Sequence, residues 1–110
     1  MNEPIATLDL LKVASTETQV PIHVEIACPR LDADGVWTCT VLVQGLDDKP
    51  RDVYGQDSLQ ALCLALRLVS THLQCAGVRG QRLVYADGKT EFSVSNYFKA
   101  IADSQTEPSA

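Results

Sequence analysis

Four cysteines and two histidines are the residues of this chain best suited to metal binding or nucleophilic chemistry. No two of the cysteines have the Cys-x-x-Cys spacing that is typical of a zinc site. His72 and Cys75 are three residues apart and could share a helix face, but no further ligand or recognisable oxyanion hole accompanies them. The sequence therefore predicts no catalytic residues, no metal site and no cofactor. It favours buried cysteines that act as small hydrophobic side chains, namely Cys28, Cys39, Cys63 and Cys75. An enzyme that uses His72 with Cys75 or Cys63 is the alternative.

Two other short patterns could carry chemistry, and both have simpler interpretations. Asp32-Ala33-Asp34-Gly35 resembles the opening of a calcium-binding loop, but the later bidentate glutamate and the flanking helices are missing. It predicts a hairpin turn instead. Gly55, Gly77 and Gly80 do not form a phosphate-binding loop, because no glycine-rich turn followed by a lysine is present. His23 lies on the solvent side of a predicted strand.

A long helix predicted from Ser58 to Gln74 is the element that must position any site. Asp57 is a good N-cap, Gln60 stands in the capping-box position, and Gly77 predicts the C-terminal end. The side chains around the middle turns of this helix are apolar on almost every side. The exception is one narrow polar stripe, which consists of Gln60, Arg67, Thr71 and Gln74. A surface helix needs only one apolar face. We therefore expect a cover on more than one side, from the sheet and from either a C-terminal helix or a second copy of the protein.

Alternating patterns upstream of this helix predict a β-hairpin. The even positions of residues 20–28 are mostly apolar, as are most odd positions of residues 36–45. If Asp32–Gly35 form the loop, both apolar sets face the same side of the sheet, and Cys28 lies opposite Cys39 on that buried side.

The remaining predicted elements are shorter. Residues 46–50 form a turn by composition, and Asp87-Gly88 predicts a second hairpin turn. The spacing in residues 6–13 fits an edge strand slightly better than a helix. Further strands are predicted at 51–54, 81–85 and 90–94, and Ser95 could cap a short helix over 96–102 that offers Tyr97, Phe98 and Ile101 to the core.

These elements predict an α+β fold of two layers. An antiparallel sheet of four to six strands packs on one long helix, and a short C-terminal helix follows. We expect a single domain over residues 1–102 and a frayed tail over residues 103–110.

Composition and charge narrow the classes of partner. The 110 residues carry a net charge of −5, and residues 1–57 hold ten acids and four bases, whereas residues 58–110 hold four acids and five bases. No basic stripe interleaved with aromatic residues is present, so nucleic acid is not expected as a partner. No uninterrupted apolar run approaches the roughly 20 residues of a membrane span, and no signal peptide is evident. The sequence thus predicts a cytoplasmic protein, without membrane attachment, whose acidic half could meet a basic protein partner.

Several segments together resemble a known family. They are Pro29-Arg30, the run from Asp34 to Cys39, Gly45-Leu46, and the helix start Tyr54-Gly55-Gln56-Asp57-Ser58-Leu59-Gln60-Ala61-Leu62. With them, residues 20–75 look like a family of small bacterial proteins of unknown function, and the Gly-x-Asp-Ser-Leu-Gln-Ala-Leu run is the most specific part. The resemblance implies a bacterial cytoplasmic protein with the α+β layout, and it implies no activity and no functional residues.

A non-enzymatic protein-interaction or regulatory module is the function that the sequence favours. An immunity-type protein or a regulatory subunit would fit its size and charge, and the partner could also be a second copy in a homodimer. The residues most suited to contact a partner are Tyr54, Arg67, Arg79 and Arg82. A small-ligand-binding domain with a pocket between helix and sheet is the alternative.

Overall fold

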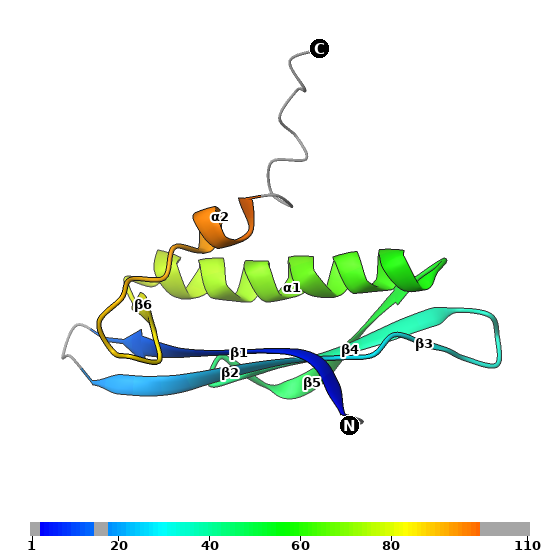
Figure 1. Ribbon diagram of the computed structural model, residues 1–110, viewed down its shortest axis with the longest axis horizontal. Helices are drawn as coiled ribbons and strands as arrows, with labels where there is room; N and C mark the ends of the chain where they lie inside the picture. The colour runs from blue at the N-terminus through cyan, green and yellow to red at the C-terminus, as the bar shows by residue number, and fades with distance from the viewer. Residues whose placement is uncertain (1–2, 15–17, 100–110) are drawn as a thin grey trace, which may run out of the picture.

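One antiparallel sheet and one long helix form the two layers of the fold (Figure 1). The computed structural model describes residues 3–14 and 18–99. Its elements are β1 (Pro4–Val13), β2 (Gln19–Ala27), β3 (Arg30–Leu31), β4 (Trp37–Gln44), β5 (Asp47–Gly55), α1 (Ser58–Val78), β6 (Arg82–Tyr85) and α2 (Val94–Tyr97). The predicted α+β class is confirmed, with six strands in the sheet.

The register of the central strands agrees with the predicted hairpin. The strand order is β3–β4–β2–β1–β6, and β5 pairs with the other side of β4. His23 pairs with Gln44 and Ile26 with Val41 across β2 and β4. The alternating apolar side chains therefore share one face, where they form the core with α1; they include Ile22, Val24, Ile26, Cys39, Val41 and Val43.

The predicted strand over residues 6–13 is confirmed, but its predicted edge position holds only before Leu10, because residues 10–13 have strand partners on both sides. They belong to β1, which lies between β2 and β6 and pairs with both strands. Leu10 pairs with Ile22 on one side and with Tyr85 on the other. Leu10 and Val13 are consequently buried.

The predicted meeting of Cys28 and Cys39 is also wrong. Ile26 of β2 pairs with Val41, but Arg30 of β3 pairs with Thr38. The chain from β2 to β3 therefore has one more residue between these pairs than β4 has opposite it. Cys28 is exposed, whereas the buried Cys39 donates its thiol hydrogen bond to the Ala27 carbonyl, 3.3 Å away.

Cys63 and Cys75 depart from the prediction of buried cysteines as well. Both are exposed on α1. Cys63 stands beside Gln60 and Arg67 in the polar stripe, so its burial would require a cover on the outer side of the helix, where none lies within the described ranges. Only Cys39 among the four cysteines is buried.

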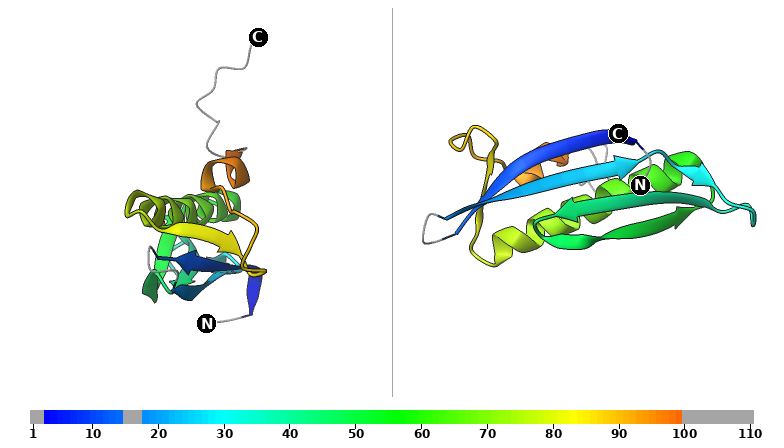
Figure 2. Two further views of the ribbon diagram at one scale, coloured as in Figure 1. Left: turned by 90° about the vertical axis from the view of Figure 1, so that its left-hand side faces the viewer. Right: turned by 90° about the horizontal axis from the view of Figure 1, so that it is seen from below.

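Strand β5 begins earlier than predicted. The chain turns at Gly45 and Leu46, and Asp47–Pro50 already pair with or extend along β4, so the predicted turn at 46–50 is wrong. Gly45 has a φ of 100°, and a Cβ there would lie 2.5 Å from the Pro21 carbonyl oxygen. Charged residues and Pro50 are tolerated in this strand because it lies at the edge of the sheet, as seen from below (Figure 2, right).

Helix α1 starts as predicted and ends four residues later. Asp57 accepts a hydrogen bond from the Gln60 amide, and the Gln60 side chain accepts one from the Gln56 amide, both at 2.7 Å. The helix runs through Gly77, because the left-handed residue that ends it is Gly80, with a φ of 79°. The Gly80 and Gln81 amides bond back to the carbonyls of the last turn, as in a Schellman motif.

The polar stripe of α1 is exposed, and the opposite face is buried on the sheet. The buried residues are Ala61, Ala65, Val69, Ser70, Leu73 and Ala76. By length and composition α1 could cross a membrane, so the prediction that no segment is long and apolar enough is too strong. A core helix of a soluble protein meets the same criterion, and this helix packs on the sheet (Figure 1).

The C-terminal part of the described chain differs in detail from the prediction. Residues 90–94 do not form a strand, and only Glu91 bridges to Val84. Ser93, rather than Ser95, caps the short helix α2, whose Asn96 amide bonds to the Ser93 hydroxyl. Phe98 is buried as predicted, whereas Tyr97 is 51% exposed. Ile101 and the predicted tail lie outside the described residues.

Helix α2 and Phe98 cover part of a second side of α1, in addition to the sheet. Phe98 is part of the core, and Val94 of α2 packs against it. Together with Leu66 and Val69 of α1, Phe98 closes the space above β1 and β2, apart from an apolar cavity of about 80 Å³.

Candidate interaction site

A shallow groove runs between α1 and the edge strand β5. It encloses about 360 Å³ and is lined by Val53, Tyr54, Leu64, Arg67, Leu68 and Thr71. Half-buried Val53, Leu64 and Leu68 give it an apolar floor, and exposed Tyr54, Arg67 and Thr71 give it a rim that can form hydrogen bonds. We call these six residues the α1–β5 groove.

Gly55 brings the two walls of the groove together. A Cβ on Gly55 would lie 2.6 Å from the backbone nitrogen of Ala61 in α1. Only a glycine lets the end of β5 approach the first turn of the helix this closely. The capped start at Asp57 then directs α1 back over β5, so Arg67 and Tyr54 line the same groove.

Arg67 differs from the other arginines whose side chains have acidic partners. Arg51 bonds to both carboxylate oxygens of Asp47, Arg82 bonds to Glu91 at 2.7 Å, and Arg30 lies 3.9 Å from Asp52. Within residues 3–14 and 18–99, no carboxylate forms an ion pair with Arg67. Its positive charge is therefore available to a partner.

The four residues suggested by the sequence fall into separate places. Tyr54 and Arg67 share the α1–β5 groove, and Tyr54 is 60% exposed. Arg79 is the C-cap of α1, twelve residues beyond Arg67, or about 18 Å along the helix axis. Arg82 lies in β6 and is already paired with Glu91.

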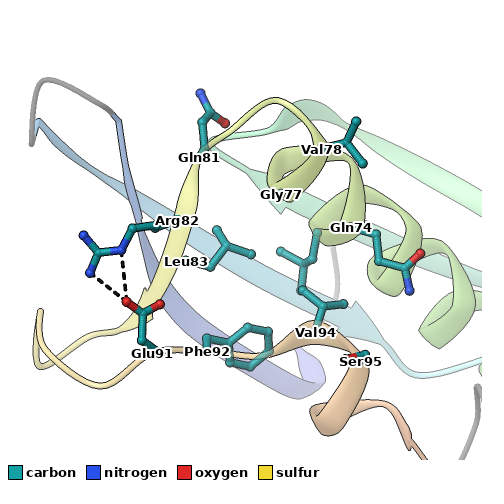
Figure 3. A pocket seen from close by; sticks show the side chains of 11 residues that line it. Gln74, Gly77, Val78, Gln81, Arg82, Leu83, Glu91, Phe92, Val94 and Ser95 are labelled. Carbon is teal, nitrogen blue, oxygen red and sulfur yellow. Dashed lines mark hydrogen bonds and ion pairs between the residues drawn. The ribbon is translucent and has the colours of Figure 1, made fainter.

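A second depression lies at the Arg82 end of the molecule (Figure 3). It encloses about 500 Å³ between the last turns of α1, β6 and residues 91–95. Leu73, Leu83 and Phe92 line its apolar part, and the Arg82–Glu91 pair stands at its rim. Because these two charges neutralise each other, this depression offers less charge to a partner than the α1–β5 groove does.

His72 turns toward β5 and not toward a cysteine. Its Nε2 lies 3.6 Å from Asp47 Oδ2, and Cys75 is exposed. Hydrogen bonds from Arg51 hold the pKa of Asp47 below its ordinary value, so Asp47 is a carboxylate at neutral pH. The contact between His72 and Asp47 therefore links α1 to the edge strand beside the groove.

The sequence missed a cluster on the sheet face opposite α1. His23 Nδ1 lies 2.5 Å from Asp9 Oδ1, and its Nε2 lies 3.7 Å from Glu25. The hydrogen bond with Asp9 raises the pKa of His23, the nearby negative charges add to this effect, and partial burial opposes it. The alternation of β2 places His23 and Glu25 on one face, but Asp9 could be added only once the β1–β2 register was known.

On the same face Thr40 links two charged residues. Its hydroxyl donates to Asp52 at 2.6 Å and accepts from Arg30 at 3.0 Å. Asp52 and Arg30 therefore have partners within the sheet. No group of three or more His, Cys, Asp or Glu residues suited to a metal ion occurs in the part of the chain that the structure describes.

Comparison with known families identifies the class of this protein. A family model described as a domain of unknown function, DUF6968, matches residues 9–94. The chain therefore belongs to this family. The match includes the 20–75 segment on which the resemblance to a family of unknown function was based. No curated protein and no solved structure matches the chain.

Proposed function

We propose that this protein is a non-enzymatic interaction module that binds a partner protein through the α1–β5 groove. The observation that carries the proposal is that exposed Tyr54 and Arg67, which has no acidic partner among the described residues, both line a groove with an apolar floor. Tyrosine and arginine are enriched in protein interfaces and among the residues that contribute most to binding. Tyr54 and Arg67 would be the main contacts.

The shape of the groove favours a protein over a small ligand. Pockets for small molecules usually enclose about 300–1,000 Å³ and bury most of the ligand. The cavity between the helix and the sheet encloses only about 80 Å³, and the larger α1–β5 groove is shallow. A small-ligand-binding domain stays the alternative, and a thermal-shift screen of metabolites tests it.

Capture experiments from the native host test the proposal with matched variants. We expect a stoichiometric partner to bind the wild-type protein and to be lost with Tyr54→Ala or Arg67→Glu. Arg79→Glu makes the same change of charge on an exposed residue outside the groove, so it should retain the partner. A partner that binds all four proteins equally would exclude the groove as its site.

The finer identity of the module is also a proposal. An immunity-type protein or a regulatory subunit fits the small size and the acidic first half of the chain. Bacterial origin, a cytoplasmic location and the absence of nucleic-acid and membrane partners stay predictions.

Self-association likewise stays a prediction. The apolar circumference of α1 suggests self-association, although the sheet and α2 already cover part of this circumference. Exposed Leu59, at 68%, still leaves an apolar side chain near the start of the helix. Light scattering at increasing concentration would show a dimer of twice 11.9 kDa, and a constant monomer mass would refute the prediction.

A further inference from the structure

Strand β5 has one edge without a strand partner. It pairs with β4 on one side, and no other described strand pairs with it (Figure 2, right). The outer edge of such a strand presents backbone N–H and C=O groups that another extended chain can pair with. The edge is thus a second potential contact surface beside the α1–β5 groove.

The two halves of β5 differ in how readily another strand could pair with their outer edge. Residues 47–50 are two aspartates, a lysine and Pro50, and proline has no N–H to donate. Residues 51–55 lack proline and include Val53 and Tyr54, residue types that favour strands. The part of the edge open to pairing is therefore the part that borders the groove.

The side chains above this open half select a particular kind of segment. In an added strand, every second side chain would point to the helix side of the sheet. One such side chain would lie over the apolar floor at Val53 and Leu68, and another would face Arg67. An apolar residue suits the first position, and a carboxylate suits the second because Arg67 has no acidic partner in the described residues.

We propose that an extended segment of the partner protein, with an apolar and an acidic residue two positions apart, adds as a strand to residues 51–55 of β5 and places these two side chains in the α1–β5 groove. This inference rests on the proposed function and specifies its binding mode. Backbone pairing would contribute affinity, and Arg67 together with the apolar floor would contribute selectivity.

A peptide selection tests the chemistry of the segment. The probe is a phage-displayed library of random ten-residue peptides, selected on the full chain. We expect enrichment of peptides with an apolar and an acidic residue at alternate positions. Arg67→Glu should weaken the selected synthetic peptide about tenfold or more, while Arg79→Glu leaves its affinity unchanged. Failure to enrich such a pattern, or equal weakening by both variants, would overturn the proposal.

Amide hydrogen exchange tests the backbone pairing separately. In the free protein the outward amides of residues 51–55 should exchange rapidly, and saturating peptide should slow alternate amides about tenfold or more. Binding that depends on Arg67 without this protection would overturn strand addition and leave the groove as the partner site. If the native partner also binds the Tyr54→Ala and Arg67→Glu variants as well as it binds the wild-type protein, the proposed function itself is wrong.

Discussion

His23 shows how a single residue links two strands on the sheet face opposite α1. It extends from β2 to Asp9 of β1, with Glu25 on its other side. Its raised pKa means that the folded state binds the proton more tightly than the unfolded state does. The added stability is thus complete below the unfolded pKa of about 6.5 and is lost as pH rises through the folded pKa.

Replacing His23 should change how the stability of the protein depends on pH. His23→Gln should be less stable than wild type in urea denaturation at about pH 5, and the difference should shrink by about pH 9, where the wild-type imidazole is neutral. Asp9→Asn should reduce the same pH dependence, because it removes the main cause of the raised pKa. A difference between His23→Gln and wild type that does not change with pH would contradict the role of protonation.

Gly55 and Gly77 should respond in opposite ways to substitution by alanine. Gly55→Ala would place a Cβ 2.6 Å from the Ala61 nitrogen and should lower the free energy of unfolding by about 1–3 kcal/mol. Gly77→Ala meets nothing within 4 Å and lies inside a helix, so it should raise that free energy by up to about 1 kcal/mol. Equal effects of the two substitutions in denaturant titrations would show that the close approach of β5 to α1 is not a constraint.

The start of helix α1 is set by the local chemistry of its N-cap. Asp57→Ala removes the acceptor for the Gln60 amide and should lower the free energy of unfolding by about 1 kcal/mol. Thermal denaturation measures the change, and Asp57→Asn, which retains a capping oxygen, should recover most of it. Equal loss in the alanine and asparagine variants would indicate that the cap is not the cause.

Local patterns predicted the elements whose signals lie within a few residues. The capped start of α1, its polar stripe and the β2–β4 register could all be derived from spacing alone. The length of β5 could not, because Asp47–Pro50 resemble a turn and become a strand only through pairing with β4 at the edge. The same holds for the exposure of Cys28, which depends on one extra residue opposite β4.

The candidate site was predictable only in part for a similar reason. Tyr54 and Arg67 were singled out from the sequence, but their common groove depends on where β5 meets α1. Arg82 could not be set aside from the sequence, because its pairing with Glu91 depends on how residues after β6 fold back.

The packed core of the molecule extends beyond the residues of the family match. The match ends at residue 94, yet Phe98 is 7% exposed and belongs to the core. Phe98→Ala should therefore lower the free energy of unfolding by about 3–5 kcal/mol, whereas Tyr97→Ala should have a smaller effect because Tyr97 is half exposed. Urea denaturation in which Phe98→Ala has no effect would place this segment outside the folded unit.

The exposed thiol of Cys63 offers a place to attach a fluorescent probe for binding in the groove. Cys63 lies one helical turn before Arg67, whereas burial of the Cys39 thiol raises its pKa and shields it. With Cys28 and Cys75 replaced by serine, a maleimide fluorophore would attach at Cys63 alone. Its emission would then change when a partner occupies the neighbouring groove, so binding could be followed without labelling the partner.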